Sequence, residues 1–357
     1  YYTWNEDVTG ALLAREVLGA ADRGVRVRVL LDDLYVRGNE RALMALAEHP
    51  SVEIRLYNPF RVRTWGTLGA AVDFLLASYR LNHRMHNKAW IADGRLFVGG
   101  GRNIGDEYFD AAKQFNFRDL DLVVEGVSAA EAVAQFDRYW NSVRARPLEE
   151  LAAAAAVRKR ADRPGGLAGL RRRLEAAASG QEGAEYLAQS AGGPDLAALL
   201  ADGRVLVPVD RVRIAADPPR KGLGRRRAPG MLAEVRTAIG GARREVLIAS
   251  PYFVPGRRGA KLLAGLVRRG VRVVVVTNSL AATDVLAVHG GYARRRRRLL
   301  RAGVELRELK RGGQEGASLL GSGGNASLHT KAFCVDGELA FVGSFNFDPR
   351  SAHLNTE

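Results

Sequence analysis

The feature that most constrains this chain is an internal duplication. The block from Met85 to Asn103 reads MHNKAWIADGRLFVGGGRN, and 243 residues later the block from Leu328 to Asn346 reads LHTKAFCVDGELAFVGSFN. Each block follows a similar unit of amphipathic helix, Gly stop and β-branched strand, at residues 12–33 and 262–279. The duplication therefore predicts an α/β fold of two pseudo-symmetric lobes, with mixed sheets flanked by helices. In such a pair, equivalent residues face one shared active site.

The duplication also predicts the domain boundaries. We expect a first lobe at residues 1–144, a second lobe at 205–357 and, between them, a helical connector at 145–204 that is rich in Ala and Arg. A chain of 357 residues is long enough for two such domains. It begins inside one expected strand and ends inside another. We therefore expect the first lobe to lack its N-terminal strand and the second lobe to be cut short at its C-terminus.

The charge of the chain favours anionic partners. Lys and Arg number 54 against 39 Asp and Glu, which gives a net charge of +15. The Arg-rich tracts at 220–227 and 294–298 are typical of a solvated surface, and they also suit an anionic membrane surface. Because aromatic side chains are almost absent from these tracts, we expect no nucleic acid as a partner.

The single cysteine, Cys334, excludes an intrachain disulfide, and no paired Cys and His spacing indicates a zinc site. We therefore expect no metal or other cofactor, and a location that faces the cytoplasm. No apolar run approaches the roughly 18 residues of a membrane-spanning helix. The sequence as given predicts no span.

Each duplicated block has the spacing His-x-Lys-x4-Asp-x6-Gly-(Gly/Ser)-x-Asn. Residues two apart on a strand share a face, so the His and Lys of each block point to the same ligand. An imidazole can attack an electrophile or carry a proton near neutral pH, and an ammonium beside it holds negative oxygens. An Asn after a small-residue turn can donate further hydrogen bonds to those oxygens. The two blocks thus predict one phosphoryl-transfer site that contains His86, Lys88, Asn103, His329, Lys331 and Asn346.

The other motif positions predict supports for this site. Asp93 and Asp336 stand at DG turns, where we expect them to hold the hairpins rather than to carry protons. Small residues form the turn before each Asn, and ordinary turn chemistry is compatible with that role. They are Gly100 and Gly101 in the first block, and Gly343 and Ser344 in the second.

These motifs resemble those of the phospholipase D superfamily, whose hallmark is a duplicated HKD motif. The sequence is most similar to the C-type branch of the bacterial cardiolipin synthases. The segments that carry this resemblance are GGRNIGDEYF at 100–109, RDLDLVVEG at 118–126, TNSLAATDVLAVHGGYAR at 277–294, GSFNFDPRS at 343–351 and LNTE at 354–357. The resemblance runs nearly end to end and is weakest across 145–204.

The resemblance implies a metal-independent exchange in two steps at a phosphodiester. In the family the first-half histidine is usually the nucleophile, which gives His86 that role and makes His329 the general acid and base. Each histidine also needs an acid on its other ring nitrogen, and in the family that acid lies on the strand after the motif. Asp119 follows His86 by 33 residues and Glu357 follows His329 by 28. Asp121 is an alternative to Asp119, because residues two apart on a strand share a face.

The activity that this resemblance implies is a phosphatidyltransferase that makes cardiolipin from two phospholipids through a phosphohistidine. It favours phosphatidylglycerol together with phosphatidylethanolamine as substrates, and a peripheral position on the bacterial cytoplasmic membrane. The need for an accessory protein stays open. A phospholipase D hydrolase would use the same residues, and a nuclease of the superfamily is a further alternative.

Overall fold

A computed structural model describes residues 1–36, 40–60, 71, 75, 77–126, 128–151, 165–192, 198, 207–223, 230–310 and 325–357. The first half contains a three-stranded sheet in the order β1-β2-β7. In this sheet β1 (Val27–Asp32) and β2 (Val52–Tyr57) are parallel, and β7 (Ala145–Pro147) is antiparallel to β2. Helices α1 (Val8–Asp22), α2 (Asp33–Val36) and α3 (Glu40–Ala47) accompany it.

A second three-stranded sheet of the first half carries the first motif. It is antiparallel and consists of β3 (Ala89–Ala92), β4 (Leu96–Gly100) and β6 (Asp121–Glu125), with α5 (Ala129–Trp140) packed on β3 and β4. Asp93 and Gly94 join β3 to β4 with φ angles of 52° and 64°. Such a turn matches the twist of a tight hairpin, which explains the DG pair.

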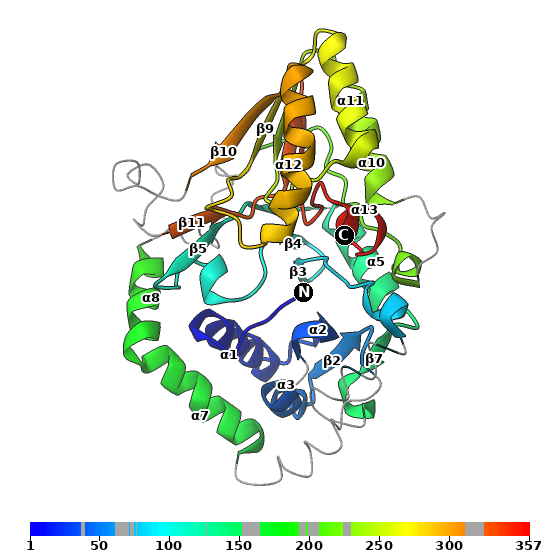
Figure 1. Ribbon diagram of the computed structural model, residues 1–357. Helices are drawn as coiled ribbons and strands as arrows, with labels where there is room; N and C mark the ends of the chain where they lie inside the picture. Colours follow the sequence, from blue (N-terminus) through cyan, green and yellow to red (C-terminus); the bar gives the residue numbers. More distant parts are fainter. Residues whose placement is uncertain are drawn as a thin grey trace.

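The second half forms one five-stranded mixed sheet in the order β10-β9-β8-β12-β13, at the top of Figure 1. Its strands are β8 (Glu245–Ala249), β9 (Arg272–Asn278), β10 (Glu305–Leu309), β12 (Ala332–Val335) and β13 (Leu339–Val342). Its helices are α10 (Met231–Gly240), α11 (Gly256–Arg268), α12 (Leu286–Arg301) and α13 (Pro349–His353). The second motif lies on β12 and β13, the counterparts of β3 and β4.

The expected α/β fold of two lobes is confirmed, with one difference between the halves. In the second half β8 lies between β9 and β12. In the first half the counterparts β1 and β3 belong to separate sheets, and the described residues place no strand between them. Each half nevertheless has its own apolar core, one centred on β1 and β2 and the other on β8 and β9.

The expected connector contributes two described helices, α7 (Gly166–Ser179) and α8 (Gln181–Ala191). Leu170 and Leu174 of α7 are buried in the core of the first half, where α7 packs on α1 and α3. The pairing of β7 with β2 shows that the sheet of the first lobe extends past residue 144. Residues 152–164, 193–197 and 199–204 of the connector lie outside the described residues.

Short segments from distant parts of the chain join the two halves. The strand β5 (Phe115–Arg118) of the first half pairs in parallel with β11 (Asn325–Leu328) of the second. Figure 1 shows this pair at the junction of the lobes. A bridge between Met85 and Thr356 is its counterpart. The described residues also form the 3-10 helices η1 (Asp106–Tyr108), η2 (Leu148–Glu150) and η3 (Pro219–Leu223). Within the described ranges, every helix is too short or too polar to cross a bilayer.

Candidate active site

The backbone of each motif histidine is hydrogen-bonded to a short segment of the other half. The His86 N–H donates to the Thr356 carbonyl (2.9 Å), and the Thr356 N–H donates to the Arg84 carbonyl (2.9 Å). In the same way the His329 N–H donates to the Arg118 carbonyl (2.7 Å), just after the β5–β11 pair. The backbone of each half therefore fixes the position of the histidine in the other half.

The two acids are exchanged between the halves. His86 Nδ1 lies 2.8 Å from Glu357 Oε2, and His329 Nδ1 lies 2.5 Å from Asp119 Oδ2. The order along the chain predicts that Asp119 serves His86 of the first motif and that Glu357 serves His329 of the second. The structure crosses these pairs, because the residues after β5 and Thr356 run alongside the opposite motif. Asp121, the alternative to Asp119, accepts from Arg102 Nε (2.6 Å) instead.

The acids determine the tautomer of both imidazoles. An ionised carboxylate only accepts hydrogen bonds, so Nδ1 of each histidine carries the hydrogen and Nε2 keeps its lone pair. Burial raises the pKa of Asp119, but the charges of Lys331 and His329 outweigh it and lower the pKa below its usual value. Glu357 is likewise lowered by His86 and Lys88 against the effect of burial. Both acids are thus ionised at neutral pH.

The two lysines stand beside the two histidines and are buried. Lys88 Nζ donates to the His86 carbonyl (2.7 Å), and Lys331 Nζ donates to the His329 carbonyl and lies 2.8 Å from its Nδ1. Burial lowers the pKa of Lys331 to about 8 and that of Lys88 well below its usual value. Poorly solvated ammonium groups of this kind attract an anion strongly.

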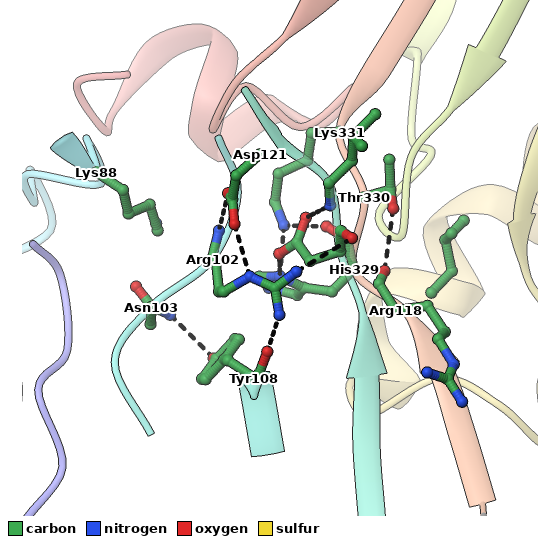
Figure 2. A network of polar contacts seen from close by, with 12 residues as sticks. Lys88, Arg102, Asn103, Tyr108, Arg118, Asp121, His329, Thr330 and Lys331 are labelled. Carbon is green, nitrogen blue, oxygen red and sulfur yellow. Dashed lines mark hydrogen bonds and ion pairs between the residues drawn. The ribbon is translucent and has the colours of Figure 1, made fainter. Parts of the chain in front are cut away.

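The charges of the two motifs interact across the site. Burial is the main cause that lowers the pKa of His329 to about 3, and both Lys331 and Lys88 add to it. Burial likewise lowers the pKa of His86, and Lys331 of the other half contributes. Figure 2 shows Lys88 and Asn103 on one side of the polar network and Lys331 with His329 on the other. Two motifs far apart in sequence thus form one site, in which two ammonium groups stand beside two carboxylates.

Both motif asparagines are buried, and Oδ1 of each has no hydrogen-bond partner among the described residues. Asn103 Nδ2 lies 2.9 Å from the hydroxyl of Tyr108, as Figure 2 shows. A half turn of the amide would let Oδ1 accept from that hydroxyl and would direct Nδ2 away from Tyr108. In that orientation Asn103 can donate to an oxyanion in the site.

The supporting positions lie in tight turns or in close backbone contacts. A Cβ on Gly101 would lie 2.6 Å from Asp119 Oδ1, and a Cβ on Gly100 would lie 2.1 Å from Asp121 Oδ1. A Cβ on Gly343 would meet the ring of Phe341 at 2.9 Å. Asp336 accepts from the backbone N–H groups of 243, 244 and 245, at 2.9, 2.7 and 2.8 Å. Asp93 lies in its hairpin turn, and Ser344 is buried.

Sequence reasoning missed two residues that hold the backbone before each histidine. Asp32, at the end of β1, accepts from the Met85 N–H (2.8 Å) and pairs with the buried Arg84. Asn278, at the equivalent end of β9, accepts from the Leu328 N–H and donates to the Leu328 carbonyl (both 2.9 Å). The sequence signal for both residues is the polar end of each repeated strand, LLDD at 30–33 and VTNS at 276–279.

Two further residues hold the acids. Arg102 donates to Asp121 and to the carbonyls of Tyr108 and Asp119, as Figure 2 shows in part. Asp217 accepts from the Glu357 N–H (3.1 Å), and its own N–H donates to the Glu357 carbonyl (2.8 Å). Neither residue repeats between the two blocks, so the duplication gave no indication of them. The part of the chain that the structure describes contains no group of three or more His, Cys, Asp and Glu placed to hold a metal ion.

Comparisons with known proteins agree with this geometry. The family model described as "Cardiolipin synthase, PLD-like domain" matches residues 1–140 and 235–357. Cardiolipin synthase C of Escherichia coli (strain K12) is 42% identical over 365 residues, which cover all of this chain and 74% of that protein. A cardiolipin synthase of Geobacillus kaustophilus (strain HTA426) is 27% identical over 363 residues and is covered to 56%.

A solved structure shows the same fold. The phosphatidylserine synthase of Haemophilus influenzae Rd KW20 superposes with a TM-score of 0.60 and 14% sequence identity, over 99% of this chain and 73% of that one. Its likeness supports the two-lobed architecture, while the family model and the bacterial relatives carry the assignment. The chain is an enzyme of the phospholipase D superfamily and belongs to its cardiolipin synthase family, on the C-type branch.

Proposed function

We propose that this chain is a phosphatidyltransferase that forms cardiolipin from two phospholipids through a phosphohistidine, without a metal ion. The observation that carries the proposal is the joining of two His-Lys-Asn sets in one buried site, where each histidine is oriented by an acid of the other half. Membership of the cardiolipin synthase family favours the same activity.

In the first step, the Nε2 lone pair of His86 attacks the phosphorus of the donor phospholipid. A P–N bond forms, the P–O bond to the headgroup alcohol breaks, and His329 gives its Nε2 proton to the departing oxygen. The hydrogen bond from His86 Nδ1–H to Glu357 stabilises the positive charge that develops on the attacking ring.

In the second step, His329 takes the proton from a glycerol hydroxyl of phosphatidylglycerol. The hydroxyl oxygen attacks phosphorus, the P–N bond breaks, and His86 is regenerated. Each phosphate keeps one negative charge before and after the exchange. Phosphatidylethanolamine is the proposed donor on the resemblance to the C-type branch.

The protonation of His329 must couple to substrate binding. Burial and the nearby ammonium groups hold its pKa at about 3, so the free imidazole is neutral. A phosphodiester between Lys88 and Lys331 adds a negative charge that opposes this effect and raises the pKa. The same two ammonium groups stabilise charge on the phosphoryl oxygens, a role that a metal ion has in other phosphoryl transferases.

A transferase must also limit attack by water on the phosphohistidine. Both motif histidines and both lysines are buried, which limits water at the reacting phosphorus. The net charge of +15 suits an anionic lipid surface. We therefore propose a peripheral enzyme on the cytoplasmic face of the bacterial membrane.

The test uses the 357-residue chain with vesicles of phosphatidylglycerol and phosphatidylethanolamine, with EDTA present, and follows lipid products by mass spectrometry. We expect cardiolipin from the parent chain and none from His86→Ala, while His49→Ala, a change at a histidine paired with Asp22 outside the site, keeps activity. Rapid acid-free quenching and proteolysis should yield a phosphatidyl group on the peptide that contains His86.

Phosphatidic acid without cardiolipin would make the protein a hydrolase. Cleavage of oligonucleotides without any lipid product would favour the nuclease alternative. A phosphatidyl group on the peptide of His329 would exchange the two histidine roles, and product that disappears with EDTA would contradict metal independence.

A further inference from the structure

The duplication places one exposed leucine at the same position of each lobe. Leu34 and Leu280 both stand two residues after the strand-end residue that holds the backbone before a motif histidine, which is Asp32 in one half and Asn278 in the other. Their relative exposure is 38% and 59%. Both leucines therefore stand close in sequence to a residue that holds the backbone before a motif histidine, where an apolar ligand of the site would cover them.

In the first half, the residue after the exposed leucine is connected to His86 through aromatic ring contacts. Tyr35, 54% exposed, contacts the ring of Tyr2 with centroids 5.2 Å apart, and Tyr2 contacts the imidazole of His86 at 5.1 Å. The Lys88 ammonium lies 5.5 Å from the same Tyr2 ring. A series of ring contacts thus runs from the exposed Tyr35 to the first motif.

The second half presents a similar group. Val285 and Leu286, at the start of α12, are 38% and 69% exposed. They follow Asp284, which accepts a hydrogen bond from the Tyr252 hydroxyl (2.5 Å). Asp284 is one of the charges that oppose the effect of burial on the pKa of Lys331, so this segment lies near the second motif. We name Leu34, Tyr35, Leu280, Val285 and Leu286 the entrance residues.

Positive charge extends from the entrance residues along α12. By helical spacing, Arg294, Arg297 and Arg301 share the face of Leu286, and all three are exposed. The helix rise places them about 12, 16 and 22 Å from Leu286 along the axis. In Figure 1, α12 lies on the near side of the molecule, with its N-terminal end toward the centre and α2 below it. One face of α12 therefore combines Leu286 with these arginines, and its N-terminal end points toward α2, which carries Leu34 and Tyr35.

We propose that this face docks on an anionic phospholipid bilayer, with the entrance residues inserted at the level of the acyl chains and the α12 arginines on the headgroups. The inference rests on the proposed function, because a lipid substrate has to leave a bilayer to reach the site. Apolar insertion next to basic side chains is the composition of interfacial membrane contacts. A second copy of this chain would bring the same arginines against each other, which disfavours self-association through this face.

Three leucines provide the test. Leu34→Ser/Leu280→Ser/Leu286→Ser is compared with Val143→Ser/Leu187→Ser/Leu339→Ser, which changes side chains that are 81%, 42% and 45% exposed elsewhere. Sedimentation with vesicles of phosphatidylglycerol and phosphatidylethanolamine measures binding, and thermal unfolding checks that each variant is folded. We expect the entrance variant to lose about tenfold or more in vesicle binding, and the control variant to bind as the parent does.

Activity gives an independent readout. Dibutyryl phosphatidylglycerol, present as monomers, reaches the site without docking, so the ratio of vesicle activity to monomer activity should fall about tenfold in the entrance variant. Arg294→Gln/Arg297→Gln/Arg301→Gln should reduce binding to phosphatidylglycerol vesicles by about fivefold per charge and leave phosphatidylcholine binding unchanged.

The docking proposal is overturned if the entrance variant binds vesicles as the parent does, or if the two triple variants lose binding equally. It is also overturned if light scattering shows a parent dimer that the entrance variant breaks without a change in vesicle binding. Vesicle binding that depends on the entrance residues, together with no lipid product from either substrate, would support docking and contradict the proposed function instead.

Discussion

At the scale of single residues, the site is built from ionisable groups whose pKa values are shifted by burial and by one another. Lys331 is fully buried beside His329 and donates to its carbonyl. Burial lowers its pKa to about 8, although Asp119 and Glu357 oppose the effect. Lys331 is therefore charged at pH 7 and loses its charge about one pH unit higher, whereas a surface lysine with its usual pKa stays charged.

This pKa predicts the alkaline side of the pH profile. As pH rises through about 8, Lys331 of the free protein loses the proton that stabilises phosphoryl oxygens, so kcat/KM should fall. Lys331→Arg keeps its charge to much higher pH, and its falling limb should move up by at least one pH unit even if its maximal kcat/KM is lower. The measurement is kcat/KM against pH from 6 to 10 on a monomeric lipid. An unchanged limb in Lys331→Arg would assign it to another group.

The acids make a second prediction at this scale. Asp119 contacts His329, whereas Asp121 contacts Arg102. Asp119→Asn removes the charge that holds the tautomer and should lower kcat about a hundredfold or more. Asp121→Asn leaves the Asp119 carboxylate in place and should cost much less. Steady-state kinetics of both isosteric variants check this, and equal losses would show that position 119 has no special role.

At the scale of elements, the turn after β4 brings the acid to the histidine. Gly100 and Gly101 lie so close to β6 and to Asp119 that neither has room for a Cβ. The antiparallel pairing of β4 with β6 carries the chain from this turn back past the motif. The turn after β4 thus requires glycine because a Cβ would collide with neighbouring atoms, not because its backbone is left-handed.

Gly101→Ala therefore tests the turn. Its Cβ would stand 2.6 Å from Asp119 Oδ1, so the carboxylate must move away, and we expect kcat to fall about tenfold or more with a loss of about 1–3 kcal/mol in the free energy of unfolding. Gly19→Ala in α1 is the matched control, because its Cβ meets only a flexible Arg23 side chain at 3.6 Å. That control should gain about 0.5–1 kcal/mol. Urea unfolding and kinetics on both variants decide, and a fully active Gly101→Ala would contradict the packing argument.

The sequence predicted the parts of this site that repeat. Spacing and alternation place His, Lys and Asn of each block on one hairpin, and those local rules do not depend on the rest of the chain. The acid partners depend on which distant strands pair, and parallel pairing of β5 with β11 leaves no signal in either strand alone. Arg102 and Asp217 were missed for a related reason, since each acts in one half only and their partners are largely backbone groups.

At the scale of the whole molecule, neither half holds a complete candidate site. The acid that orients His86 comes from the second half and the acid that orients His329 from the first. The backbones of the two halves also pair with each other, through β5 and β11 and through the Met85–Thr356 bridge. Packing of the lobes and assembly of the site are therefore one event, and a change at the junction should affect both histidines.

The crossed pairs can be observed directly by ¹⁵N NMR of the imidazole nitrogens, assigned with His86→Gln and His329→Gln. Glu357 raises the pKa of His86 against the larger effect of burial, so Glu357→Gln should lower that pKa further and shift the signals of His86 most. Asp119→Asn should do the same to His329. Glu182→Gln, which changes an exposed partner of Lys113, should leave both unchanged. If Asp119→Asn instead shifts His86 most, the acids pair within each half, and the lobes would then meet at the site without exchanging the groups that orient it.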